Sequence, residues 1–202
     1  MKLLVKLAPV ALAAFVAACA SPSPAPVLLT LPPTGAPATA AAATGAPASA
    51  PLLAVRRVAI PEYLVSRRVR YRADAATLAE WPNTYWAERI EIGVAREFVS
   101  ALRQQLPGWA MCDTNCGDQV PGLNLQVSFV PMDFLRGART LQARARITLS
   151  GGGVPAKELS TKDLSVDIPA NADTAQAHAQ AISTLLEKVA AEAAPLVRAA
   201  RP

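Results

Sequence analysis

Apolar residues recur at helical spacing in two parts of the chain. Between residues 86 and 106 they return at about every fourth position: Trp86, Ile90, Val94, Phe98, Leu102 and Leu106. This period predicts an amphipathic helix of about twenty residues with one buried face, ended by Pro107 and Gly108. Near the C-terminus a second stripe is formed by Ile182, Leu185, Leu186, Val189, Ala193 and Leu196. It predicts a second long helix, opened by Asp173 and Gln176 in a pattern that resembles a capping box.

Between these two helices, apolar and polar residues alternate with the period of a strand. Alternation over residues 123–130 and 141–149, and a further segment at 158–168, predict three strands. Turn residues separate them, with Arg136-Gly137-Ala138-Arg139 after the first and Gly151-Gly152-Gly153 after the second. Consecutive strands joined by short turns pair in an antiparallel manner, so we expect a meander.

Shorter strands are expected on either side of the first helix. Residues 52–60 are β-branched and apolar and stop at Pro61, which lacks a ladder donor. Residues 109–112 suggest a short strand after the helix. In residues 68–72, three arginines alternate with apolar or aromatic residues and therefore share one strand face. That face either binds anionic headgroups or is the solvated outer face of a half-exposed sheet.

Strands that run together and two segregated helices are typical of an α+β domain. We expect a single domain over residues 52–202, with a mainly antiparallel sheet and both long helices packed on one face. A doubly wound α/β sheet is the weaker alternative. The segment 19–51 is rich in Ala, Pro, Thr, Ser and Gly and is expected to be mostly a mobile tether. Its one apolar run, 27–31, predicts a strand docked on the domain's edge, which would make 32–51 a long loop.

The first residues have the pattern of a bacterial lipoprotein signal. Lys2 and Lys6 precede a short apolar region, and the small pair Ala17-Ala18 stands directly before Cys19. Residues 1–18 are predicted to be cleaved, leaving Cys19 modified by acyl chains such as palmitate. The apolar run is too short for an uncleaved membrane helix, which needs about 20 residues. Because two or more acyl chains hold a protein firmly on a membrane, Cys19 is the predicted anchor.

The predicted anchor indicates the compartment of the protein, and cleavage of the signal segment changes its net charge. Residue 20 is Ala rather than the Asp that commonly retains lipoproteins at the inner membrane, so we predict the outer membrane and its periplasmic face. Loss of Lys2 and Lys6 lowers the formal net charge from +5 to +3. This mildly basic chain, in that compartment, is not expected to bind nucleic acid, but contact with lipid phosphates fits it.

Two cysteines, Cys112 and Cys116, remain after lipidation. In an oxidising periplasm two such thiols usually pair, and the short polar loop between them suits a disulfide. The competing interpretations are a redox pair or a metal site. The intervening three residues do not fit a thioredoxin-like motif, and the single histidine, His178, lies in another predicted element. We interpret His178 as a helix-surface residue without a ligand role.

Motifs for catalysis are missing from the sequence. It contains no glycine-rich phosphate loop after a strand, no Gly-x-Ser-x-Gly elbow and no cluster with metal-ligand spacing. The acidic residues are scattered. We therefore expect a protein that is not an enzyme and uses no metal or cofactor.

Three short segments, in order, resemble one known family. They are Ile60-Pro61-Glu62-Tyr63-Leu64, the strand Val69-Arg70-Tyr71-Arg72, and Trp86-Ala87-Glu88 opening a helix that ends at Leu106-Pro107-Gly108. Together with the lipobox they resemble the ABC-type transport auxiliary lipoproteins (PqiC/YmbA-like) over roughly residues 27–196. The chain departs from that family in its Cys112 to Cys116 loop and in its long Ala/Pro-rich insertion at 32–51.

The resemblance implies an outer-membrane lipoprotein that accompanies an MCE-type ABC system, which moves phospholipid or another hydrophobic substrate and supports membrane integrity. It implies docking on an MCE-domain protein (PqiB-like), with a ring of identical subunits as a further expectation. It carries no catalytic residues. Pro61, Glu62 and Tyr63 are candidate partner-binding positions, and the alternative is that their turn only sets the geometry of the fold. A lipid-binding module and a purely structural envelope lipoprotein remain open as other classes.

Overall fold

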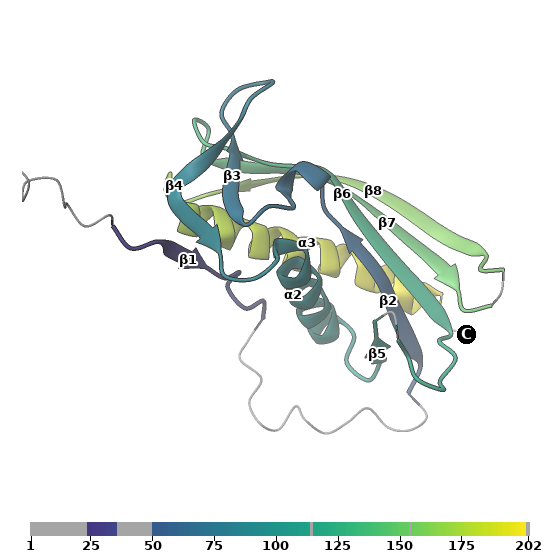
Figure 1. Ribbon diagram of the computed structural model, residues 1–202. Coiled ribbons are helices and arrows are strands. Elements are labelled where there is room, and N and C mark those ends of the chain that lie inside the picture. Colours follow the sequence, from purple (N-terminus) through teal and green to yellow (C-terminus); the bar gives the residue numbers. More distant parts are fainter. Residues whose placement is uncertain (1–23, 36–49, 114, 154, 201–202) are drawn as a thin grey trace, which may run out of the picture.

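The computed structural model describes residues 24–35, 50–113, 115–153 and 155–200, so the predicted signal segment and Cys19 lie outside it. These residues form two layers, a sheet and a pair of helices that cover one of its faces (Figure 1). The single α+β domain predicted from the sequence is confirmed. Within the described residues neither helix is both long and apolar enough to cross a membrane.

Eight strands make up the sheet, and the longest of them, β6, holds its two halves together. One side of β6 pairs along its length with β7, which pairs in turn with β8; both ladders are antiparallel, as the predicted meander requires. The other side of β6 pairs in parallel with β2 and, at its last residue, with β3. The strands are β1 (Val27–Leu29), β2 (Leu52–Ala59), β3 (Arg68–Arg72), β4 (Leu78–Trp86), β5 (Ala110–Cys112), β6 (Leu123–Leu135), β7 (Thr140–Gly151) and β8 (Glu158–Pro169).

The two halves of the sheet extend outward from β2 and β3. Strand β2 pairs in parallel with β5, whereas β3 pairs antiparallel with β4, which carries β1 in parallel on its far side. The sheet is therefore mixed, although its two longest ladders are antiparallel. Figure 1 shows β1, β3 and β4 at one end of the molecule, with β5 and the last turns of α3 at the other.

Alternation along the strands decides which face is covered. On β7 the side chains at every second position are buried, namely Leu141, Ala143, Ala145, Ile147 and Leu149, and those between them reach the solvent side. The helices α2 (Ile90–Gln105) and α3 (Ala175–Ala199) pack on the buried face and against each other. Phe98 of α2 and Phe129 of β6 are fully buried, so the space between sheet and helices is filled by side chains.

Two boundaries of the predicted helices are wrong. Trp86 ends β4, and α2 begins only at Ile90, because Trp86 pairs in the sheet with Leu29. At the second helix the cap is Thr174, whose Oγ1 accepts a hydrogen bond from the Ala177 N–H at 3.1 Å. Asp173, predicted to cap, instead accepts hydrogen bonds at 2.9 Å from Arg136, whose guanidinium lies over the Trp81 ring.

His178 is buried, which corrects its prediction as a helix-surface residue. It lies on the face of α3 that packs against the sheet, and its ring stacks on Phe134 with centroids 4.6 Å apart. Its Nδ1 has no hydrogen-bond partner among the described residues. Burial lowers the pKa of His178 to about 3, so the ring is neutral at ordinary pH.

Candidate functional site

The segment 24–35 crosses the domain as a strap between the predicted lipid anchor and the rest of the chain. At its start, the carbonyl oxygens of Pro24 and Ala25 accept hydrogen bonds from Asn83 Nδ2 at 2.8 and 3.0 Å. Val27–Leu29 then forms β1 at the outer edge of the sheet, where the sequence predicted an edge strand at 27–31. Leu29 and Leu31 are buried in the core. The strap is therefore part of the folded domain.

Thr34, almost fully buried, ties the end of the strap to α2. Its backbone N–H donates to Glu97 Oε2 at 2.9 Å, and its hydroxyl donates to the Glu97 carbonyl at 2.6 Å. The Thr34 carbonyl accepts hydrogen bonds from Ser100 and Gln104, both at 3.2 Å. Only a few per cent of Glu97 is exposed, so the Thr34 N–H donates to a buried carboxylate.

The other helix holds the strap as well. Ser183 on α3 donates to the Pro32 carbonyl at 2.7 Å, and the Gly35 N–H donates to Glu187 Oε1 at 3.1 Å. Gly35 has a φ of +82°, and a Cβ there would overlap the side chain of Gln104. Residues of the low-complexity segment are thus hydrogen-bonded to both helices, and we call these contacts the clamp. The apolar run at 27–31 signalled the strand, but nothing in the sequence marked Thr34, Glu97 or Asn83.

The candidate partner-binding turn begins at Pro61 and continues in the short 3₁₀ helix η3 (Glu62–Leu64). Pro61 is buried, so it is corrected from a surface position to one that shapes the turn. Tyr63 is half-buried and donates its hydroxyl to Asp133 Oδ1 at 3.0 Å. Burial, together with this hydrogen bond, raises the pKa of Tyr63. Of the three residues, only Glu62 is exposed.

The arginines of β3 lie against this turn, and each has an acidic partner. Arg72 donates to Asp133 at 2.9 Å, and Arg68 and Arg70 both contact Glu80 at 3.3 Å. Arg70 also donates to the Tyr63 carbonyl at 2.8 Å. The predicted outer face is therefore a network of ion pairs that holds the Glu62–Leu64 turn on the sheet.

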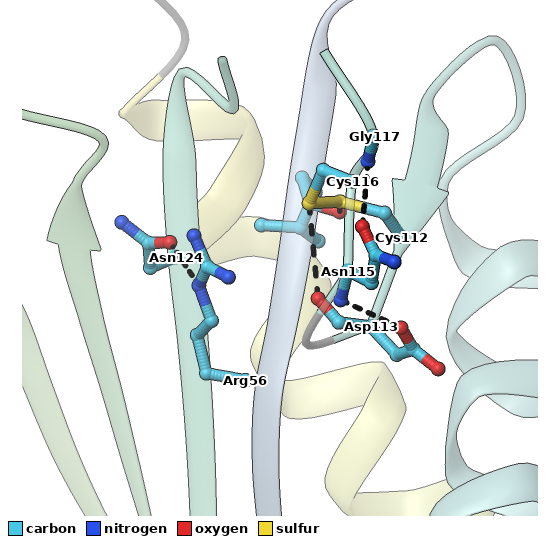
Figure 2. Close-up of a disulfide and its surroundings, with 8 residues drawn as sticks. Arg56, Cys112, Asp113, Asn115, Cys116, Gly117 and Asn124 are labelled. Atoms are coloured by element: carbon cyan, nitrogen blue, oxygen red, sulfur yellow. Dashed lines mark hydrogen bonds between the residues drawn. A yellow bond between two sulfur atoms is a disulfide. The ribbon is translucent and has the colours of Figure 1, made fainter. Parts of the chain in front are cut away.

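Cys112 and Cys116 are joined at the end of the sheet opposite β1. Their sulfurs lie 2.01 Å apart with a Cα–Cα distance of 5.2 Å, within the usual range of a disulfide (Figure 2). Side chains of Asp113 and Asn115 accept hydrogen bonds from backbone N–H groups two residues on, which fixes the loop. Nearby, Arg56 Nε on β2 donates to Asn124 Oδ1 at 2.7 Å, as Figure 2 shows.

These sites hold chain segments in place by hydrogen bonds, ion pairs and one disulfide. In the described part of the chain, no three His, Cys, Asp or Glu residues come together in a way that could hold a metal ion. Cys112 and Cys116 are paired, and His178 is enclosed by aromatic rings, so neither combines with an acidic group in a cleft. The arrangement anchors a strap at one end and presents a turn on the outer face.

Comparison with known proteins places these features in a family context. A family model described as an ABC-type transport auxiliary lipoprotein component matches residues 30–194. No curated protein matches the sequence. Among solved structures, the fold is similar to an uncharacterized protein, with a TM-score of 0.68, 17% identity, and coverage of 86% of this chain and 99% of that one. It is also similar to a Xanthomonas campestris protein described as DUF330, with a TM-score of 0.62, 15% identity, and coverage of 88% and 96%.

Proposed function

The chain belongs to the family of ABC-type transport auxiliary lipoprotein components, and from this we propose that it is the lipid-anchored accessory subunit of an MCE-type ABC transport system at the outer membrane. The family is membrane-associated and faces the periplasm. In our proposal the transported substrate is phospholipid or another hydrophobic molecule, and the protein contributes to membrane integrity.

The observation that carries the proposal is the strap. Cys19 is the acylated residue in our account, and the domain grips the chain from Pro24, five residues later. At about 3.6 Å per residue, those five residues span at most about 18 Å. An anchor followed by so short a connection holds the domain beside the membrane. Because Thr34 and Ser183 hold the strap on the helices, the low-complexity residues that follow the strap add no length to the connection between anchor and domain.

For the partner, we propose that an MCE-domain protein (PqiB-like) docks on the turn that carries Glu62 and Tyr63. Glu62 is exposed there, and Tyr63 is held in position by Asp133. Pro61 serves the turn from inside. A ring of identical subunits would present several such turns to one MCE assembly. We assign no catalytic step to this domain.

A lipid-binding module receives no support from the packing. Such a module needs space between sheet and helices for an acyl chain, whereas Leu53, Phe98 and Phe129 are fully buried in contact with the surrounding core. Opening that space would separate apolar groups that stabilise the fold, at about 25 cal/mol per Å² of apolar surface exposed. Transport assistance by docking fits the filled core better.

Three variants test the anchor and the compartment. Cys19→Ala should leave a folded protein in the soluble fraction and should fail to restore detergent resistance to cells that lack the native gene. Ala20→Asp should keep the acyl chains but move the protein to the inner membrane. A control variant that replaces both Cys112 and Cys116 with Ala keeps the lipobox and should remain in the outer membrane. Full detergent resistance with Cys19→Ala would contradict the tethering role.

A further inference from the structure

We propose that one corner of the domain rests on the phospholipid headgroups of the membrane that holds the anchor. This corner, which we call the anchor corner, consists of Leu28, Val65, Arg67, Arg68 and Tyr85. The inference depends on the lipidation of Cys19 proposed above. It adds an orientation: the domain lies on the membrane by a defined surface and does not swing freely on its anchor.

Chain length brings this corner to the bilayer. Asn83 on β4 fixes the carbonyls of Pro24 and Ala25, so only the residues between Cys19 and Pro24 separate acyl chains from the domain. They reach about 18 Å at most. Figure 1 shows β1 at the end of the molecule that also carries β3 and β4, so this is the end that meets the membrane.

The corner has the mixed apolar, aromatic and cationic surface that suits a membrane interface. Leu28, Tyr85 and Arg68 are register partners across β1, β4 and β3. Leu28 is 57% exposed and the Arg68 guanidinium lies 5.3 Å from the centre of the Tyr85 ring. Apolar and aromatic side chains with cations beside them bind at the level of headgroups, with the apolar parts toward the acyl chains.

A hollow of about 370 Å³ continues this surface around the edge of β4. It is lined by Val65, Ser66, Arg67, Ala87, Glu88, Arg89 and Glu91. The Arg67 carbonyl accepts the Trp86 N–H at 2.8 Å, which places the hollow directly next to the last residue of β4. Val65, at 37% exposed, is one of the large apolar side chains that remain on the surface there.

The charge of the corner is positive after its internal ion pairs are counted. Glu80 is shared by Arg68 and Arg70, so one carboxylate faces two guanidiniums. Arg67 is exposed and has no acidic partner within the described residues. The two carboxylates that line the hollow are paired as well, Glu91 with Arg89 and Glu88 with Arg96. Basic residues near an anionic lipid surface contribute about 1 kcal/mol each to membrane attraction, so phosphate groups complement this corner.

Lipid-headgroup quenching on the lipidated full-length mature protein tests the orientation. A fluorophore is placed at Val65→Cys or at Leu159→Cys, which lies near the start of β8 at the opposite end, without reducing the Cys112–Cys116 pair. The proteins are reconstituted into vesicles of phosphatidylethanolamine and phosphatidylglycerol that contain nitroxide-headgroup lipid. We expect several-fold stronger quenching at residue 65 than at residue 159. Arg67→Glu should reduce the difference, and Arg144→Glu, an exposed arginine on the outer face of β7, should not.

The possible outcomes separate this inference from the proposed function. Protein that floats with the vesicles but is quenched equally at residues 65 and 159 overturns the orientation and leaves the lipid anchor standing. Protein that fails to float contradicts the lipidation of Cys19, and the orientation with it. If the residue 65 probe is shielded from solvent equally in vesicles and in detergent, a second copy or another protein covers the corner, and the inference is overturned. Loss of the difference in quenching between residues 65 and 159 in vesicles of phosphatidylcholine alone supports the inference.

Discussion

Substitution Glu97→Ala is expected to release the strap while the rest of the domain stays folded. The Glu97 carboxylate accepts the Thr34 N–H at 2.9 Å, and the alanine variant leaves that N–H buried without an acceptor. A hydrogen bond to a charged group contributes about 1.5–3 kcal/mol, and an unsatisfied buried donor costs about 1–3 kcal/mol. These two descriptions overlap and are not added, so the docking of the strap should weaken by about 2–3 kcal/mol.

Native-state hydrogen exchange measures this directly. At about 1.4 kcal/mol per tenfold, the β1 amides should exchange about 30-fold to about 150-fold faster in the variant. Amides in β6 and β7, which lie in the middle of the sheet, should change much less. Glu88→Ala is the matched control, because Arg96 contacts Glu88 at 2.7 Å and Glu97 at 3.0 Å.

The control separates the clamp from an ordinary ion pair. Glu88 is partly exposed and contacts no strap residue through a hydrogen bond in the described chain, so its loss should cost at most about 1 kcal/mol. Equal acceleration of the β1 amides in the two variants would show that the Arg96 ion pairs, and not the contact with Thr34, hold the strap. Unchanged β1 exchange in Glu97→Ala would refute the clamp altogether.

Three further predictions concern other parts of the domain. Replacing both Cys112 and Cys116 with Ser should lower the free energy of unfolding in urea by about 2 kcal/mol, the chain-entropy estimate for so short a loop, and equal stability would argue against a disulfide in the native protein. The unfolded chain protonates His178 near pH 6.5, whereas burial lowers its native pKa to about 3, so the free energy of unfolding should be highest above pH 6.5 and fall on acidification. His178→Leu should flatten the slope of that free energy against pH between pH 6.5 and 5. An unaltered slope would assign the acid sensitivity to other groups. Asp133→Ala should lower the free energy of unfolding by about 2 kcal/mol because it breaks the contacts with Arg72 and Tyr63. Asp163→Ala, which breaks an exposed pair with Arg146, should change the urea midpoint little. A larger loss with Asp163→Ala than with Asp133→Ala would contradict this assignment.

Local periodicity accounts for the parts of the fold that the sequence predicts well. The apolar stripes marked α2 and α3, and alternation marked the meander of β6, β7 and β8, because each signal lies within one element and its neighbour. The run at 27–31 was visible for the same reason. Each of these segments buries one face, so its pattern follows directly from its geometry.

Pairings between distant segments were not visible. Strand β4 contains Pro82 and Asn83 and lacks clean alternation, and Trp86 fitted the helical period of α2 although it belongs to β4. The parallel pairing of β2 with both β5 and β6 depends on partners far away in sequence. His178 looked exposed because the sheet residues that cover it, such as Phe134, are remote in the chain.

In the candidate site, too, features carried by a short motif could be predicted and contacts between distant residues could not. The lipobox, the paired cysteines and the turn at 61–63 are each carried by a short motif and could be proposed from the residues alone. The clamp joins Thr34 to Glu97 across sixty-three positions, and Thr34 stands in a segment whose composition indicates a flexible linker. Buried polar contacts of this kind appear only when the fold brings the partners together.

We propose that this lipoprotein serves an MCE-type ABC transport system. The most direct test of this proposal is an affinity pull-down of the lipidated protein from gently solubilised envelopes, with partners identified by mass spectrometry and Glu62→Arg as the matched variant at the proposed docking turn. We expect an MCE-domain protein to be recovered with the wild-type protein and depleted with the variant. Recovery of the wild-type protein alone, or only with peptidoglycan and unrelated outer-membrane proteins, would contradict the claim.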